Sequence, residues 1–191
     1  MATRVKLSVI LIAALALSAC VKSALAPAKS NITLPNGDFE GWTTNDELDQ
    51  WKTNSCPACV PAYNTYIVQK TTEAYHGQYA AKLLYNGVFS ATASTKFAVP
   101  AHPFELVGYV KCQLYDNDTA FIRVNVFKAG ALVDSGTWMS TVLIKKYAKI
   151  TLPITQSTAG ADSVSISIRG GHVTTPDGNS STFWVDSFCL H

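Results

Sequence analysis

Apolar and polar residues alternate along most of the chain, which is the pattern of β-strands with one buried face. The alternation is clearest over residues 104–115 and 120–128. In the first of these segments, Val110 and Cys112 lie on the same face, which we expect to point into the core. Further strands are predicted at residues 63–70, 78–85, 89–99, 137–144, 147–154, 164–169 and 183–190.

Turn-forming residues separate these short strands, and no segment after the N-terminal leader shows the 3.6-residue period of a helix. The chain has 191 residues and shows no internal repeat. This length is enough for one domain with its own core. The predicted fold class is therefore all-β, an antiparallel β-sandwich of the jelly-roll type, formed by a single domain over residues 34–191.

The first 19 residues differ from the rest of the chain. Arg4 and Lys6 precede an apolar run over residues 8–17, which is too short to span a bilayer and is followed by small residues. This pattern predicts a signal peptide over residues 1–19, and the sequence Leu-Ser-Ala-Cys ending at Cys20 is typical of a bacterial lipoprotein. We expect lipidation of Cys20 and a membrane anchor that does not span the bilayer. The alternative is a secreted protein in which Cys20 has no such role.

Residues 20–33 are small and polar, and they predict a flexible tether between the lipid and the domain. Val21 follows the cysteine. By resemblance to lipoprotein sorting in Gram-negative bacteria, a residue other than Asp at this position favours the outer membrane over the inner one.

The charge of the chain changes when the leader is removed. The full sequence has 15 Lys and Arg against 13 Asp and Glu, and Arg4 and Lys6 are lost with residues 1–19, which leaves 13 of each and a net charge of zero. A neutral chain without charge runs argues against nucleic acid as a partner and against electrostatic binding to membranes. An uncharged ligand such as a glycan fits this composition, and a structural domain fits it equally well.

Two short runs of sequence, one near each end of the domain, are informative when they are considered together. The first, residues 36–42 (NGDFEGW), predicts an Asn-Gly turn and a short strand on which Asp38 and Glu40 share one face. The second, residues 183–190 (FWVDSFCL), places Asp186 near the start of the last strand. Together the two runs resemble the ends of the jelly-roll carbohydrate-binding modules in the galactose-binding-domain-like superfamily. The resemblance extends over residues 34–190.

The resemblance implies a structural calcium ion that ties the two ends of the domain together. Asp38 or Glu40 would supply side-chain ligands, Asp186 would supply another, and a carbonyl would come from the turn near Gly77 and Gln78. Calcium is bound by six to eight oxygen atoms of this kind. The alternative is that the acids are surface residues or partners of Lys and Arg.

A sugar platform is the second candidate site. It consists of polar and aromatic residues on the outer faces of two strands that we expect to be neighbours, with one more aromatic side chain beside them. Sugar recognition needs a flat aromatic ring for the apolar C–H face and polar groups for the hydroxyls. The alternative is an ordinary solvated surface. The predicted ligand-binding residues are Gln113, Tyr115, Arg123, Asn125 and Trp138.

Four cysteines remain besides Cys20. In an exported protein an even number suggests disulfides, and Cys56 and Cys59 predict a local disulfide in a proline-containing loop. Zinc is the alternative for this pair, but no second pair of ligands completes such a site. Cys112 and Cys189 would form the remaining pair, although their strand parities disfavour it.

No pattern in the sequence predicts an enzyme. The GxSxG motif of hydrolases and paired-histidine metal motifs do not occur, and the four histidines are scattered. We therefore expect non-catalytic binding of a glycan by a lipid-anchored protein of the cell envelope. The alternative is a structural or adhesive envelope protein that binds other proteins.

Overall fold

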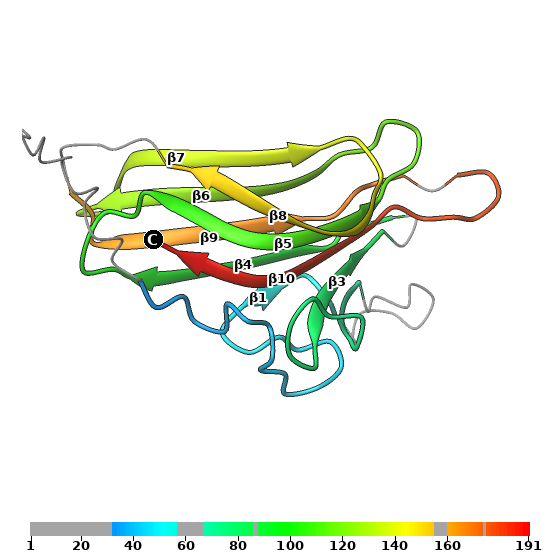
Figure 1. The fold of residues 1–191 in the computed structure, drawn as a ribbon, viewed down its shortest axis with the longest axis horizontal. Coiled ribbons are helices and arrows are strands. Elements are labelled where there is room, and N and C mark those ends of the chain that lie inside the picture. The colour runs from blue at the N-terminus through cyan, green and yellow to red at the C-terminus, as the bar shows by residue number, and fades with distance from the viewer. Residues whose placement is uncertain (1–31, 57–66, 86–87, 155–159, 174) are drawn as a thin grey trace, which may run out of the picture.

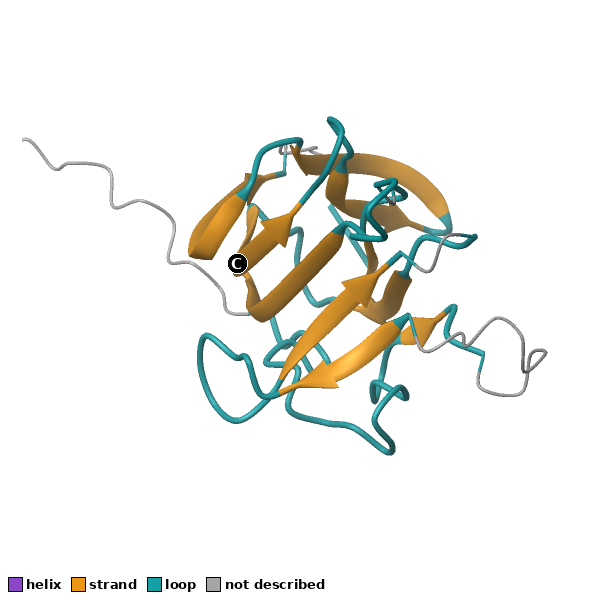
Figure 2. Ribbon diagram, turned by 90° about the vertical axis from the view of Figure 1, so that its right-hand side faces the viewer, coloured by secondary structure: helices purple, strands orange, loops and turns teal. Residues whose placement is uncertain are grey.

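A computed structural model describes residues 32–56, 67–85, 88–154, 160–173 and 175–191. The described residues contain ten strands and form no helix, so the prediction of an all-β protein is confirmed (Figures 1 and 2). The strands are β1 (Lys52–Thr53), β2 (Val68–Thr71), β3 (Ala80–Leu84), β4 (Thr92–Ala98), β5 (Glu105–Gln113), β6 (Ala120–Lys128), β7 (Ala131–Ser140), β8 (Ile144–Pro153), β9 (Ser163–Arg169) and β10 (Thr182–Leu190).

The strands form two antiparallel five-stranded sheets. Sheet 1 has the order β1-β4-β9-β6-β7, and sheet 2 has the order β2-β3-β10-β5-β8. The chain passes between the sheets after β1, β3, β4, β5, β7, β8 and β9, whereas β2–β3 and β6–β7 remain in one sheet. The last strand lies at the centre of sheet 2, between β3 and β5 (Figure 1). This confirms the predicted jelly-roll sandwich.

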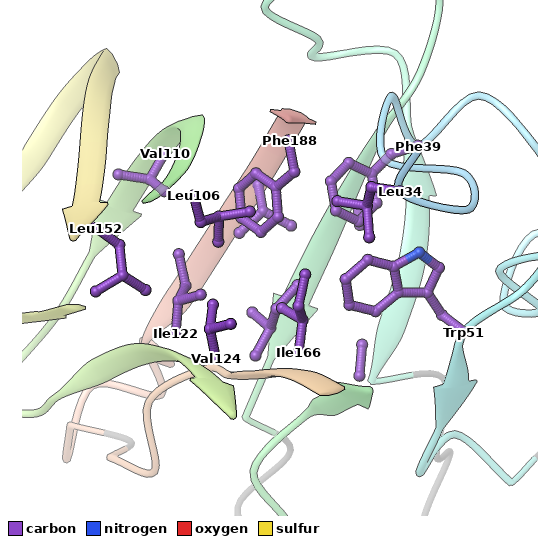
Figure 3. Packing of buried hydrophobic residues seen from close by; sticks show 14 of the residues in the cluster. Leu34, Phe39, Trp51, Leu106, Val110, Ile122, Val124, Leu152, Ile166 and Phe188 are labelled. Carbon is purple, nitrogen blue, oxygen red and sulfur yellow. The ribbon is translucent and has the colours of Figure 1, made fainter. Parts of the chain in front are cut away.

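The core lies between the two sheets and is filled by alternate residues of each strand. In Figure 3, Leu106, Val110 and Leu152 of sheet 2 point toward Ile122, Val124 and Ile166 of sheet 1, and all of them are buried. The alternation read from the sequence of β5 and β6 therefore gives the correct buried face for both strands.

The run at residues 36–42 closes one end of this core, but it does so as a turn. The predicted short strand is wrong, because residues 35–38 form a turn and Asn36 and Phe39 have positive φ angles of 44° and 57°. The turn places the fully buried Phe39 ring 5.3 Å from Trp51 and 5.2 Å from Phe188 (Figure 3). The indole N–H of Trp42 donates to the Phe39 carbonyl at 2.7 Å and holds the turn closed.

The N-terminal end of the domain pairs with its C-terminal strand. Ile32 is buried and forms a β-bridge with Leu190, so the domain begins before the predicted boundary at residue 34. The predicted signal peptide (1–19), Cys20 and the rest of the tether up to residue 31 lie outside the described residues. None of the segments that the structure describes is a helix long and apolar enough to pass through a bilayer.

Cys112 and Cys189 lie on opposite faces of sheet 2, as the alternation in their strands predicts. β10 and β5 are neighbours, but Cys112 lies opposite Phe183 and Cys189 lies opposite Val107, with an irregularity in β10 between Asp186 and Cys189. The two thiols are free, so the pairing of Cys112 with Cys189 is wrong. Cys56 is not a free thiol, but Cys59 lies outside the described residues, and their pairing stays a prediction.

Gly37 is a position where the first turn admits no side chain. A Cβ atom there would lie 2.5 Å from the Phe188 carbonyl oxygen and 2.9 Å from Leu34. We expect Gly37→Ala to lower the free energy of unfolding by about 1–3 kcal/mol, because the turn would have to move away from β10. Urea unfolding of the domain measures this change.

Thr33→Ala is the matched control, since Thr33 is exposed in the same segment. It should alter the free energy of unfolding by no more than about 0.5 kcal/mol. Equal stabilities of the two variants would contradict the proposed packing of the turn against β10.

Candidate functional site

The residues of the predicted sugar platform do not meet. Gln113 ends β5 in sheet 2, and Tyr115 follows it, whereas Arg123 and Asn125 lie on β6 in sheet 1. The outer faces of the two sheets point in opposite directions, so the prediction of a single platform is wrong. Within each pair the side chains do contact each other: the Gln113 amide donates to the Tyr115 hydroxyl, and the Arg123 Nε donates to Asn125 Oδ1 at 3.1 Å.

Trp138 also differs from its predicted role. It lies opposite the buried Ile122 in the β6–β7 pair, and therefore on the inner side of sheet 1. Its ring stacks on Phe183 at a centroid distance of 5.8 Å, and it packs against the core. Trp138 thus joins the two sheets instead of offering a ring to a ligand.

The outer face of sheet 2 carries a row of side chains that crosses four strands. Gln69 of β2 lies opposite Lys82 of β3, Lys82 lies opposite Trp184 of β10, and Trp184 lies opposite Lys111 of β5. The Trp184 ring lies under two ammonium groups, with Lys111 Nζ at 4.0 Å and Lys82 Nζ at 5.5 Å from a ring centroid. Such cation–π contacts hold long side chains in defined positions.

The loop at residues 72–79 covers the next part of this face. Tyr75 stacks on Tyr109 of β5 with a centroid distance of 3.5 Å, and it remains 48% exposed. The Tyr147 hydroxyl donates to the Glu73 carbonyl at 2.7 Å, and Lys111 pairs with the Glu73 carboxylate at 2.5 Å. Burial, followed by the negative charges of Asp186 and Glu73, raises the pKa of Tyr147, which therefore stays neutral as a hydrogen-bond donor.

Two carboxylates fix the backbone of this loop. Asp186 Oδ2 accepts the N–H groups of Tyr75 and His76 at 2.6 and 3.0 Å. Glu40 Oε1 accepts the N–H groups of Gln78 and Tyr79 at 2.8 and 3.0 Å. Burial raises the pKa of Asp186 despite these hydrogen bonds. The loop between β2 and β3 is therefore attached to both ends of the domain.

These contacts do not fit the predicted calcium site as the structure places its residues. Asp38 is exposed, Glu40 and Asp186 each accept two backbone N–H groups with one oxygen, and Gln78 donates its N–H to Glu40. Among the described residues, no three His, Cys, Asp or Glu side chains are grouped to hold a metal ion. Calcium binding stays a prediction.

Asp118 is a third carboxylate that holds a loop in place. It is buried, its Oδ2 accepts the N–H groups of His172 and Val173 at 2.6 and 2.9 Å, and its Oδ1 lies 2.8 Å from the His172 Nδ1. Burial works to raise the pKa of Asp118, but the hydrogen bonds from Ser181 and from these backbone groups outweigh it and lower the pKa.

A cavity of about 760 Å³ lies beside the edge strand β2 of sheet 2, and we call it the edge pocket. It combines an aromatic ring, an amide, a cation and one carboxylate. Asp46 is only 7% exposed, and its Oδ2 is buried without a hydrogen-bond partner among the described residues. Lys70 Nζ lies 4.8 Å from the Tyr79 ring centroid. The lining residues are Thr44, Asn45, Asp46, Gln69, Lys70, Thr71, Thr72 and Tyr79.

A smaller cavity of about 290 Å³ lies on β10, β5 and β8 of the same sheet, and we call it the face pocket. Gln113 is the one predicted ligand-binding residue that lines it. Trp184 contributes an indole whose Nε1 is buried and has no acceptor in the described part of the chain. The lining residues are Lys111, Cys112, Gln113, Leu143, Ile144, Lys145 and Trp184.

Little in the sequence indicates either pocket. Asp46 lies in a polar, acidic loop, and no sequence pattern in such a loop predicts which side chain is buried. Trp184 and Lys111 do follow the alternation of β10 and β5 and could have been placed on the outer face. The pairing of these two strands, which are 73 positions apart in the chain, could not be read from that pattern.

Comparison with known proteins matches no family model and no curated protein. Solved structures do match the chain. One is TmCBM61, described in complex with beta-1,4-galactotriose, with a TM-score of 0.51 and 18% identity over 85% of this chain and 99% of that one. The chain has the fold of a carbohydrate-binding module. The predicted resemblance is therefore confirmed at the level of the fold.

The same fold occurs in proteins described as enzymes. A cyclase from Fischerella sp. TAU matches with a TM-score of 0.53 and 15% identity over 84% of this chain and 95% of that one. The enzymatically active domain of tailspike protein 4 from bacteriophage CBA120 matches with a TM-score of 0.54 and 12% identity over 84% of this chain, but only 21% of that one. Function must therefore be argued from the site.

The lowered pKa of Asp118 predicts a contribution to stability that depends on pH. Because the folded pKa lies below the unfolded value of about 3.9, the contribution is complete above that value and is lost as the pH falls through the folded pKa. We expect Asp118→Asn to lower the free energy of unfolding at pH 7 by about 2 kcal/mol. The difference from the wild type should shrink as the pH falls below about 4. Urea unfolding over a series of pH values measures it.

Asp177→Asn is the control, because Asp177 is exposed in a turn. The free energy of unfolding of this variant should differ little from that of the wild type at every pH. A difference for Asp118→Asn that stays constant down to acid pH would contradict the assignment of the lowered pKa to this residue.

Proposed function

We propose that the protein binds carbohydrate without catalysing a reaction, and that the edge pocket is its main binding site. The observation that carries this proposal is Asp46: the residue lines a cavity together with Tyr79, and its buried Oδ2 finds no hydrogen-bond partner among the described residues. A buried carboxylate oxygen needs a donor. A sugar hydroxyl entering the pocket supplies one.

The other residues that line the edge pocket also suit a carbohydrate ligand. The Tyr79 ring offers an apolar surface to the C–H face of a sugar, and the Asn45 side chain and the hydroxyls of Thr71 and Thr72 offer donors and acceptors to its hydroxyls. The cavity lies within the range of about 300–1,000 Å³ that is usual for small-molecule sites. TmCBM61, which has the same fold, is described with a bound galactotriose, and this supports the choice of ligand class.

The acids of the two pockets favour binding over hydrolysis. A typical glycosidase uses two carboxyl groups on either side of the scissile bond. Among the described residues, Asp46 is the one carboxylate in the lining of the edge pocket, and the lining of the face pocket contains none. Some proteins of this fold are enzymes, but the linings of these two pockets still favour binding over hydrolysis.

The proposed place of action comes from the N-terminal sequence. The leader over residues 1–19 and the lipidation motif at Cys20 support an anchor in the cell envelope, with Val21 favouring the outer membrane of a Gram-negative bacterium. On this proposal, the tether holds a glycan-binding domain near the membrane surface.

One observation favours the alternative of a structural or adhesive protein. Met139 near the end of β7 is 66% exposed, and Val142 and Leu143 just before β8 are 63% and 50% exposed. Large exposed apolar side chains are found at protein–protein contacts when they form a continuous patch. They do not, however, account for Asp46, whose Oδ1 accepts the Thr44 hydroxyl at 2.9 Å while its buried Oδ2 has no hydrogen-bond partner among the described residues.

Binding of the domain (residues 32–191) to a glycan array, followed by calorimetry with the best ligand, tests the proposal. We expect Tyr79→Ala and Asp46→Asn each to weaken binding at least about tenfold, because one removes the ring and the other removes the charged acceptor. Circular dichroism would confirm that the variants are folded.

Tyr115→Ala and Asp177→Asn are the matched controls, and we expect them to bind like the wild type. If Tyr115→Ala lost binding and Tyr79→Ala kept it, the site would lie away from the edge pocket. A folded domain that bound nothing on the array would contradict carbohydrate binding and favour the adhesive alternative.

A further inference from the structure

The face pocket is lined by four side chains that carry hydrogen-bond donors, two of them cationic. Lys111 and Lys145 supply ammonium groups, Gln113 supplies an amide, and Trp184 supplies its indole N–H. No acidic side chain of the described part of the chain lines the pocket. A lining of this kind is complementary to an acceptor that carries negative charge.

Trp184 is the strongest indication that a ligand completes this pocket. The side chain is only 7% exposed, and its Nε1 is buried without an acceptor among the described residues. Lys111 and Lys82 hold the ring from the neighbouring strands, so that the indole cannot easily turn to find an acceptor elsewhere. Buried indole N–H groups usually have a partner.

The balance of charges around the pocket also favours a negatively charged ligand. Glu73 pairs with Lys111 from the loop above the sheet, which leaves the charges of Lys145 and Lys82 on this part of the surface. Lys145 is exposed at the start of β8. An anion that entered the pocket would meet Lys145 beside the buried indole N–H of Trp184, which has no acceptor among the described residues.

We propose that the face pocket binds the carboxylate of an acidic sugar, a uronic acid residue within a glycan. This inference rests on the proposed carbohydrate binding and specifies the class of glycan. Leu143, which is half exposed, and Ile144 add an apolar wall that suits the ring of a sugar better than a small free anion.

The position of the two pockets explains how one glycan chain would reach both. Gln69 lines the edge pocket, Lys111 and Trp184 line the face pocket, and Lys82 stands between them in the row of outward side chains. From β2 to β5 the row spans three strand spacings, roughly 14 Å. This distance is longer than one sugar ring and suits an oligosaccharide that lies across the strands.

Calorimetric titration with oligomers of galacturonate, glucuronate and mannuronate tests this inference. Each oligomer is compared with its methyl ester, which has the same ring and linkage but no charge. We expect at least one free acid to bind at least about tenfold more tightly than its ester, as a charged hydrogen bond requires. If every ester bound as well as its acid, the inference would be overturned.

Variants of two neighbouring lysines distinguish a specific contact with the ligand from general electrostatic attraction by the surface. Lys145→Ala should weaken binding of the acid about tenfold and leave binding of the ester unchanged. Lys146→Ala is the matched control, because it removes the same charge from the next position of β8 but does not line the pocket. Equal losses in the two variants would show attraction by the surface as a whole and would overturn the inference.

The indole N–H of Trp184 provides a second readout. Its signal in a nitrogen–proton correlation spectrum, assigned with Trp184→Phe, should move on addition of the acid and not on addition of the ester. An unmoved signal despite tight binding would also contradict the inference.

The inference and the proposed function can fail separately. Neutral glycans that bind through Tyr79 and Asp46, with no preference for acids, would uphold the proposed function and overturn the inference. The absence of binding to any neutral or acidic glycan would overturn both.

Discussion

Carboxylate groups that accept backbone N–H groups hold the loops of this protein on its sandwich. Asp186 comes from the central strand of sheet 2, and Glu40 comes from the N-terminal turn, yet both bind the same loop at residues 72–79. Asp118 does the same for the loop that begins at His172. Hydrogen bonds to a charged acceptor are stronger than neutral ones, and a buried carboxylate without them would be costly. The position of the loops therefore depends on these few side chains.

Both pockets depend on that arrangement. Tyr79, which lines the edge pocket, receives its position from Glu40, and the loop that contains Tyr75 and Glu73 covers the outer face of sheet 2 next to the face pocket. The strand pairing of the sheet supplies the remaining residues in a fixed row. Because hydrogen bonds to charged carboxylates join the loop to the sandwich, the outer face is ordered before a ligand arrives, which lowers the entropic cost of binding.

Alternation in the sequence was enough to predict most of the strands, their buried faces and the sandwich, because a half-buried strand has a strict period of two. It missed the short β1, and the strand predicted at 137–144 runs across the connection between β7 and β8. It was not enough to place the site. The period tells which way Arg123 and Gln113 point within their own strands, but not that β5 and β6 belong to different sheets. Trp138 was taken as an available ring, although its register opposite Ile122 turns it inward. Asp38 and Glu40 were assigned to one face of a strand, whereas the positive φ angles at Asn36 and Phe39 make this segment a turn. Partners for Asp118, Asp186 and Trp184 come from distant parts of the chain, and composition and local pattern carry no trace of them.

Hydrogen exchange at the backbone N–H groups of Tyr75, His76, Gln78 and Tyr79 tests most directly how the loops are held. The comparison is between the domain with excess calcium and the domain with a chelator. If the carboxylates bind the backbone, these four N–H groups are protected to the same degree in both conditions, and Asp186→Ala removes the protection of Tyr75 and His76. Protection that appears only with calcium would contradict this account, because Glu40 and Asp186 would then hold an ion and not the loop.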